Sequence, residues 1–188
     1  MSTTSTIFFI GKPGCGKGTQ TKLLGEHTGW PVFASGRLFR AIAQQDSMVG
    51  RKIKSEVDAG GLPPHWFAMH LYLESLLSIS EDSSAIFDGF NRRVPEAELV
   101  IQSLLWLKRP YKVVYIDITD ETVHERVAGR TQVERRVDDA VVTERLKEYY
   151  ANTAESIELF RAAGALIEVN GEQTPVKIAA DIRVALGL

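Results

Sequence analysis

The chain has 188 residues, of which 44% are hydrophobic and 24% charged, an ordinary composition for a globular protein of about one domain. A formal net charge of −2 gives no reason to expect nucleic-acid binding over the whole surface, so any anion site must come from local clustering of basic side chains. The single cysteine, Cys15, excludes an intrachain disulfide and a cysteine-rich zinc site. No apolar run approaches the ~18 residues of a membrane span, and the polar N-terminus is unlike a signal peptide. We therefore expect a cytoplasmic location without membrane contact.

Apolar runs and helical patterns alternate along the chain. The runs predict five buried strands, at 7–10, 31–34, 85–87, 112–118 and 165–169. The helical patterns cover 17–28, 37–45, 48–59, 65–77, 95–107, 121–127, 141–163 and 175–186. This alternation predicts one α/β domain over residues 1–188, built on a parallel sheet covered on both faces. Two stretches, 35–78 and 126–145, interrupt the alternation and are expected to be inserts that move over the core.

A glycine-rich segment follows the first predicted strand. Gly11, Gly16 and Lys17 fit the G-x-x-x-x-G-K pattern of a phosphate-binding loop. Glycines let backbone N–H groups turn toward an anion, the following helix N-terminus adds partial positive charge, and the lysine adds a full one. A glycine-rich turn without a ligand is the alternative, but the preceding strand and the following helix favour a phosphate loop. The residues expected to hold the donor phosphates are Gly14, Cys15, Gly16, Lys17, Gly18 and Thr19.

Polar residues follow several predicted strands. In an open parallel sheet the ligand crevice lies at the carboxyl ends of the strands, where this chain carries Gly11, Ser35, Asp88 and Asp117. A carboxylate at such a point suits a magnesium site, since Mg²⁺ prefers oxygen ligands and keeps its waters. Asp88 is therefore the candidate metal residue, acting through water, although a helix cap or a turn would also explain an aspartate there.

The loop sequence G-K-G-T-Q, with Gly18 where most such loops carry Ser or Thr, resembles the adenylate kinase family of nucleoside monophosphate kinases in its short-lid form. Residues 35–40, S-G-R-L-F-R, are similar to the family's T-G-D-L-L-R, and residues 88–93, D-G-F-N-R-R, to its D-G-F-P-R-T. The resemblance implies that Arg40 and Arg92 clamp the phosphate of the acceptor nucleotide, a task for which the planar guanidinium is well suited. The chain departs from the family at Arg37, where an aspartate helps hold the waters of magnesium, and at Asn91 and Arg93.

The same resemblance places the acceptor base beside residues 57–64 and 94–98. Glu96 stands where the family has a glutamine that binds the adenine edge. A carboxylate can only accept hydrogen bonds, so it meets adenine N1 with repulsion unless protonated, whereas guanine offers it two donors. AMP is the expected acceptor, and GMP, UMP and CMP stay as alternatives. The full set implied for the acceptor is Ser35, Arg40, Gly61, Pro63, Gly89, Arg92, Glu96, Arg136 and Arg145.

The arginine-rich stretch 126–145 resembles the short lid of the family, while a solvated face of mixed charge is the alternative explanation. By this resemblance Arg126, Arg130, Arg136 and Arg145 gather around the transferring phosphoryl group together with Lys17 and Arg92. Arg126 and Arg130 also bind ATP, and the loop at Thr174 frames the donor adenine. Residues 35–78 are then the acceptor-binding insert and residues 126–145 the lid.

The resemblance covers nearly the whole chain and implies a P-loop NTPase fold with a five-stranded parallel sheet. It implies reversible phosphoryl transfer from Mg²⁺-bound ATP to a nucleoside monophosphate, with nucleotides as the partners and a monomer as the expected state. A weakly active nucleotide-binding regulator is a second hypothesis, motivated by Arg37 and Asn91. A switch GTPase is a third, disfavoured because the chain has no N-K-x-D guanine motif.

Overall fold

A computed structural model describes residues 5–129 and 140–188. Its centre is a five-stranded sheet in the order β2-β3-β1-β4-β5, in which every pair of neighbours is parallel. The strands are β1 (Thr6–Ile10), β2 (Val32–Ala34), β3 (Ala85–Asp88), β4 (Tyr111–Asp117) and β5 (Leu166–Asn170). The predicted α/β fold with a parallel sheet is confirmed. Because the strands are parallel, their carboxyl ends share one edge of the sheet.

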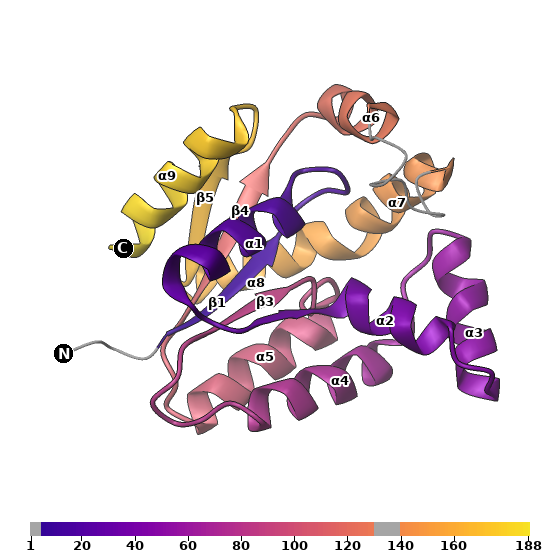
Figure 1. Cartoon of the computed structure of the whole chain (residues 1–188), viewed down its shortest axis with the longest axis horizontal. Helices are drawn as coiled ribbons and strands as arrows, with labels where there is room; N and C mark the ends of the chain where they lie inside the picture. Colours follow the sequence, from indigo (N-terminus) through magenta and orange to yellow (C-terminus); the bar gives the residue numbers. More distant parts are fainter. Residues whose placement is uncertain (1–4, 130–139) are drawn as a thin grey trace.

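Helices cover both faces of the sheet (Figure 1). They are α1 (Lys17–Thr28), α2 (Ser35–Ala43), α3 (Met48–Asp58), α4 (His65–Leu77), α5 (Val94–Trp106), α6 (Asp120–Ala128), α7 (Val142–Glu148), α8 (Ala154–Ala162) and α9 (Pro175–Leu186). Among the described residues, none of the helices is both long and apolar enough to cross a membrane.

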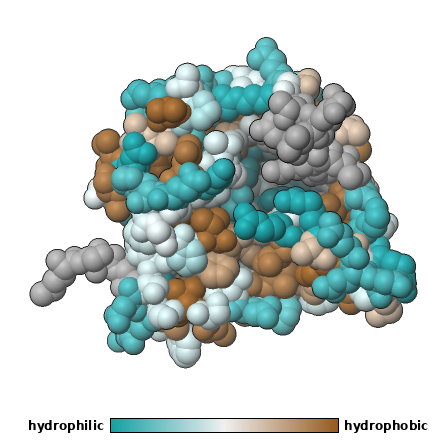
Figure 2. Space-filling model, viewed as in Figure 1, coloured by the Kyte–Doolittle hydropathy of each residue, from teal (hydrophilic) through white to brown (hydrophobic). Residues whose placement is uncertain are grey.

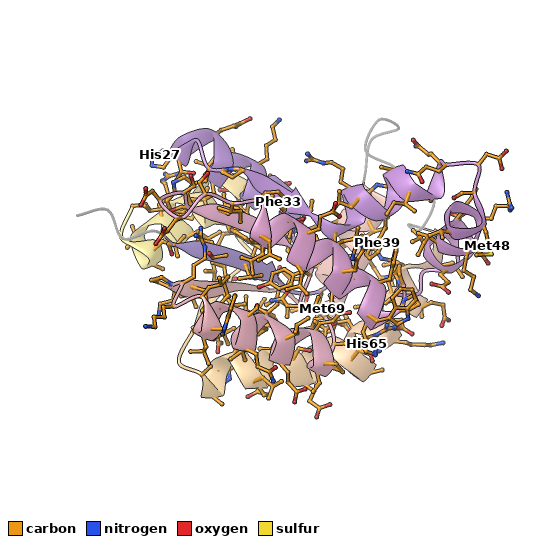
Figure 3. All side chains as sticks on the ribbon, turned by 90° about the horizontal axis from the view of Figure 1, so that it is seen from below. His27, Phe33, Phe39, Met48, His65 and Met69 are labelled. Carbon is orange, nitrogen blue, oxygen red and sulfur yellow. The ribbon has the colours of Figure 1, made fainter. Side chains whose placement is uncertain are left out.

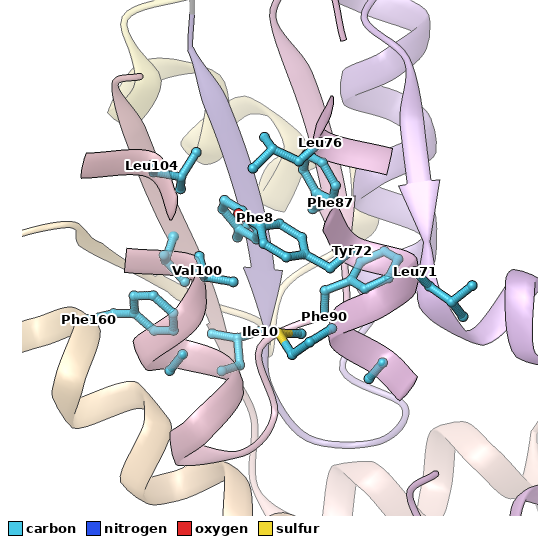
Figure 4. Close-up of a cluster of buried hydrophobic side chains, with 14 of the residues drawn as sticks. Phe8, Ile10, Leu71, Tyr72, Leu76, Phe87, Phe90, Val100, Leu104 and Phe160 are labelled. Carbon is cyan, nitrogen blue, oxygen red and sulfur yellow. The ribbon is translucent and has the colours of Figure 1, made fainter. Parts of the chain in front are cut away.

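The pleat of the strands divides the core into two clusters. Phe8 and Phe87 point to the face covered by α4, α5 and α8, and their rings stack with centroids 5.0 Å apart (Figure 4). Ile7 and Phe9 point to the opposite face, which α1 and α9 cover. Every residue of β1 is buried, which explains why the strand reads as a continuous apolar run rather than an alternating one.

The helices between β2 and β3 differ in how deeply their side chains are buried. Phe39 of α2 and Met69 of α4 are buried in the core cluster, whereas Met48 at the start of α3 is exposed and lies at the outer end of the region (Figure 3). Helix α4 packs on α5 beneath the sheet, while α2 and α3 pack mainly on each other. Whether 35–78 and 126–145 move as an insert and a lid stays a prediction.

Most of the expected helices agree with the structure to within one residue at each end, and two differ more. Helix α2 begins at Ser35 rather than Arg37, directly after β2. The long helix expected at 141–163 is interrupted by a π-helical turn, Tyr149–Thr153, where the Ala154 N–H bonds the carbonyl of Tyr149 instead of that of Tyr150. Such turns are frequent at functional sites. Here Tyr149 and Thr153 both line the cavity described below.

Candidate active site

A cavity of about 850 Å³ opens at the carboxyl edge of the sheet. The phosphate loop forms one wall, and α2, the segment between α3 and α4, and α7 form the others. Hydrophilic side chains gather around a hollow on the face shown in Figure 2. Seven basic residues of the described chain line the cavity against three acidic ones, so it favours anions: Lys17, Lys22, Arg37, Arg40, Arg92, Arg126 and Arg145 against Asp88, Glu96 and Glu148.

The phosphate loop needs glycine at two points. Gly11 has a φ of +148°, and a Cβ there would lie 2.6 Å from the carbonyl oxygen of Ile116 in β4. Gly16 has a φ of +97° and precedes the first residue of α1, with open space around it. The close approach at Gly11 lets the loop lie against the sheet. The open space at Gly16 leaves the N-terminus of α1 accessible from the cavity. This is the geometry that binds phosphate groups with backbone N–H donors.

Lys17 lies folded against the loop. Its Nζ donates to the carbonyl oxygens of Gly11 (2.7 Å) and Lys12 (2.9 Å) and approaches Sγ of Cys15 at 3.4 Å. Burial lowers the pKa of the Lys17 ammonium, against the opposing effects of Cys15 and Asp88. Anionic phosphates in the cavity would stabilise the charged ammonium and so offset the cost of burying it. The Cys15 side chain packs in the core beneath the loop, so of the predicted ATP-binding residues this one can offer only its backbone.

Lys12, which the sequence analysis did not single out, joins the loop to two later helices. Its Nζ donates to Oδ1 of Asp120 at 2.7 Å, at the start of α6, and lies 5.4 Å from the ring centroid of Tyr150. The Tyr150 hydroxyl donates to the same oxygen at 2.7 Å. Burial lowers the pKa of Lys12, but its bonds to Asp120 and Tyr150 outweigh that effect and raise it. Lys12 and Asp120 are 108 positions apart, and no sequence pattern indicates a contact between residues so distant.

Asp88 ends β3 and faces the phosphate loop. A Cβ added at Gly18 would lie 4.0 Å from its Oδ2, and both residues line the cavity with Thr19. Among the described residues, no group of three His, Cys, Asp or Glu could hold a metal ion by itself. A lone carboxylate beside a phosphate site fits a magnesium ion that is bound mainly by phosphate oxygens and water.

The acceptor side is built on the ends of β2 and β3. The Ser35 hydroxyl donates to the carbonyl of Gly89 at 2.9 Å, so its side chain joins the two strand ends. Gly89 has a φ of +79°, and a Cβ there would lie 2.6 Å from Nη2 of Arg92. Only glycine therefore lets the guanidinium lie over this turn and line the cavity. Arg40 lies over Gly36, and a Cβ there would be 3.2 Å from its Nη1.

Glu96 lines the cavity but also caps α5. Its Oε2 accepts hydrogen bonds from the backbone N–H groups of Arg92 (2.7 Å) and Arg93 (3.2 Å), and its side chain is buried. Burial raises the pKa of this carboxyl, against the opposing hydrogen bonds and the charges of Arg92 and Arg93. The S/T-x-x-E capping pattern is absent from the sequence here, since Arg93 occupies the cap position, so no local pattern indicates this role of Glu96.

The residues of the predicted lid are described in part. Arg126 in α6 donates to the carbonyl of Gly171 at 2.7 Å, and Arg145 in α7 lines the cavity. Arg130 and Arg136 lie outside the described residues. Thr174 accepts a hydrogen bond from the Lys177 N–H at 3.4 Å and so caps α9, while its neighbours Gln173 and Pro175 line the cavity. The structure thus brings Lys17, Asp88, Arg40, Arg92, Arg126 and Arg145 to one cavity.

Gln20, the last residue of the loop motif, connects this cavity to the C-terminal helix. Its Nε2 donates to the carbonyl of Pro175 at 2.9 Å, and the side chain is buried. The motif G-K-G-T-Q contained the residue, but its partner lies 155 positions away.

Comparison with known proteins agrees with this geometry. The family model described as "Adenylate kinase" matches residues 9–165. The chain is 34% identical to "Adenylate kinase" of Maricaulis maris over 183 residues, covering 96% of this chain and 97% of that protein. It is 32% identical to "Adenylate kinase 1" of a Nostoc species, covering 96% and 98%. It is 30% identical to "Adenylate kinase" of Thermus thermophilus, covering all of both.

Proposed function

The chain belongs to the adenylate kinase family, and from this premise we propose that it transfers the γ-phosphoryl group of ATP reversibly to AMP, giving two nucleoside diphosphates. It is a phosphotransferase of the nucleoside monophosphate kinase type. The observation that carries the proposal is the cavity that joins the phosphate loop to Arg40 and Arg92. The groups proposed for the phosphate donor and those proposed for the acceptor thus line one space.

The donor half of the proposal uses the phosphate loop and the segments beside it. The backbone of residues 14–19 and the Lys17 ammonium bind the donor phosphates. Arg126 of α6 binds the same phosphates, together with Arg130 as the family resemblance implies, and the loop at Thr174 frames the adenine. A bound magnesium ion would supply charge neutralisation, and Asp88 would hold it through its water shell.

The acceptor half uses Arg40 and Arg92 as a clamp on the AMP phosphate, with the base beside Gly61, Pro63 and Glu96. The acceptor phosphate is already anionic at neutral pH, so the reaction needs no general base to create a nucleophile. Positioning and neutralisation of charge then carry the catalysis. Arg136 and Arg145 complete the ring of charges around the transferring group, and closure of the lid keeps water from that group.

One assay tests this function. Coupled measurement of diphosphate formation with ATP against AMP, GMP, CMP and UMP should give the highest kcat/KM with AMP. A higher value with another monophosphate would assign that nucleotide as the acceptor. Turnover far below the ordinary ~1–10³ s⁻¹ with all four would favour a nucleotide-binding regulator.

The proposal also covers the oligomeric state and the cellular location of the protein. We expect a monomer, because one chain supplies binding groups for both nucleotides. A cytoplasmic location fits a chain whose sole cysteine is buried and unpaired within the described residues. Sedimentation at increasing protein concentration tests the first statement, and fractionation of the source cells tests the second.

A further inference from the structure

Two consecutive arginines at the start of α5 make different contacts at the cavity. Arg92 lines the cavity, where the clamp on the acceptor phosphate is proposed. Arg93 instead donates from Nη1 to the carbonyl of Pro63 at 2.9 Å and from Nη2 to the carbonyl of Leu62 at 3.2 Å. Its guanidinium is therefore directed to the backbone of the wall segment, residues 60–63, which itself lines the cavity.

The wall segment has no regular structure of its own. Leu62 and Pro63 lie between α3 and α4, outside any helix or strand, although the whole segment lines the cavity. The N–H groups of Gly60 and Gly61 bond back to the carbonyls of Val57 (3.0 Å) and Glu56 (3.1 Å), which ties the segment to α3. Helix α3 belongs to the outer region of the molecule, so these two bonds alone do not fix the segment relative to the sheet.

Arg93 supplies a connection to the sheet-bound core. Its backbone N–H is held by Glu96 at the start of α5, a helix that packs against α4 and α8. Its Nη2 also lies 3.9 Å from Oε2 of Glu148, at the end of α7. One side chain thus joins the wall segment to α5 through two hydrogen bonds and to α7 through an ion pair.

We propose that Arg93 is the positioning residue that holds the wall segment in place for the acceptor nucleotide. The inference rests on the proposed function, because it assigns this wall to the acceptor. Arginine suits the role since its planar fork presents several N–H donors in fixed directions and so can bond two successive carbonyls. A lysine could hold the charge and one carbonyl at a time. A threonine, which the family pattern has at this position, is too short to span the same gap.

The expected effect is on acceptor affinity rather than on the chemical step. Without the two hydrogen bonds the wall segment samples other conformations, and the apparent affinity falls in proportion to the population of the binding-competent one. Arg93→Ala should raise the KM for AMP by about 5- to 20-fold. The KM for ATP and kcat should stay within about twofold, since Arg93 contacts none of the proposed donor groups.

The test compares initial rates of wild type, Arg93→Ala and Arg93→Lys, with AMP and ATP varied in turn. Arg161→Ala is the matched control, because Arg161 is an arginine held by ion pairs to Glu158 and Glu168 on the surface, away from the cavity. We expect Lys to restore part of the AMP affinity and the control to match wild type. Calorimetric titration with AMP alone should give the same order of affinities.

Hydrogen exchange of the Gly60 and Gly61 amides in the nucleotide-free protein separates this inference from the proposed function. The exchange should be faster in Arg93→Ala, while α1 exchanges as in wild type. An unchanged KM for AMP in an active Arg93→Ala enzyme, or equal rises in both KM values, would overturn the positioning role. An inactive wild-type protein would overturn the proposed function instead. In that case, unchanged hydrogen exchange of the Gly60 and Gly61 amides in Arg93→Ala would still refute the positioning of the wall segment by Arg93. If Arg93→Ala does not fold, the same KM and hydrogen-exchange measurements on Arg93→Lys test the positioning role, with smaller expected changes.

Discussion

Substitution of Glu96 separates two roles that its position permits. The carboxylate accepts two backbone hydrogen bonds at the start of α5, at 2.7 Å and 3.2 Å, and it also lines the cavity where the resemblance places the acceptor base. Glutamine keeps an oxygen that can accept both N–H groups, whereas alanine keeps none. Glu96→Gln therefore preserves the cap and changes the group offered to the base, while Glu96→Ala removes both.

The magnitude follows from the contacts. Loss of a helix cap costs about 0.5–2 kcal/mol, and a buried N–H left without a partner costs about 1–3 kcal/mol. We therefore expect Glu96→Ala to lower the free energy of unfolding by roughly 1–3 kcal/mol and Glu96→Gln to change it by less than about 1 kcal/mol. Glu96→Ala should also raise the KM for AMP, because Arg92 loses the bond that fixes its backbone.

The pH dependence gives a second signature. Burial raises the pKa of Glu96 in the folded protein. A raised pKa means that the protonated acid's contribution to stability is fully present below the unfolded pKa of about 4.3 and is lost as pH rises through the folded value. Glutamine does not ionise. The stability of Glu96→Gln relative to wild type should therefore increase as pH rises through that interval and level off above it.

Urea unfolding of the three proteins between pH 4 and pH 8 measures the cap, and kcat/KM for AMP and GMP measures the reading of the base. If Glu96 faces the base, Glu96→Gln should lower the KM for AMP by about tenfold, because the amide restores a donor. Wild-type stability of Glu96→Ala would refute the capping role. Unchanged kinetics of Glu96→Gln with both nucleotides would refute base reading and leave Glu96 as a cap alone.

Three further outcomes are expected. Lys17→Met should reduce kcat by about 10²-fold or more while the protein stays folded by circular dichroism, since a preorganised charge at the transferring phosphates is lost; near-normal turnover would refute the site. The bonds from Lys12 and Tyr150 lower the pKa of Asp120, so its contribution to stability is present above the unfolded pKa of about 3.9 and lost as pH falls through the folded value. Asp120→Asn should thus be less stable than wild type by under about 1 kcal/mol in urea titrations at pH 7, the pair being partly exposed, and the difference should vanish in acid; an equal difference at every pH would contradict this. Asn91 is fully buried and its side-chain amide has no hydrogen-bond partner within the described residues, so its apolar replacement of similar shape, Asn91→Leu, should unfold at a urea concentration no lower than that of wild type, and a clear loss of stability would contradict this.

Much of the fold could be predicted because its signals are local. Five apolar runs correspond to five parallel strands, since strands buried on both faces need a continuous apolar sequence rather than an alternating one. The phosphate loop was evident for the same reason, because Gly11, Gly16 and Lys17 are close in sequence and each answers a local need for backbone freedom or charge. The π-helical turn at Tyr149–Thr153 could not be predicted, because a single turn of this kind has no periodic signal that distinguishes it from an ordinary helix.

The sequence by itself thus determined the strands, the phosphate loop and the arginines available to an anionic ligand, since residue type and short spacing carry that information. Tertiary structure alone decided which residues support them. Lys12 meets Asp120 across 108 positions, and Arg93 meets Pro63 across 30. Such contacts depend on how the helices and strands pack, and a hydrogen bond between distant residues produces no periodic pattern in the sequence. Glu96 shows the same limit, because whether its carboxylate caps a helix or faces a base depends on a rotamer that only the folded neighbours select.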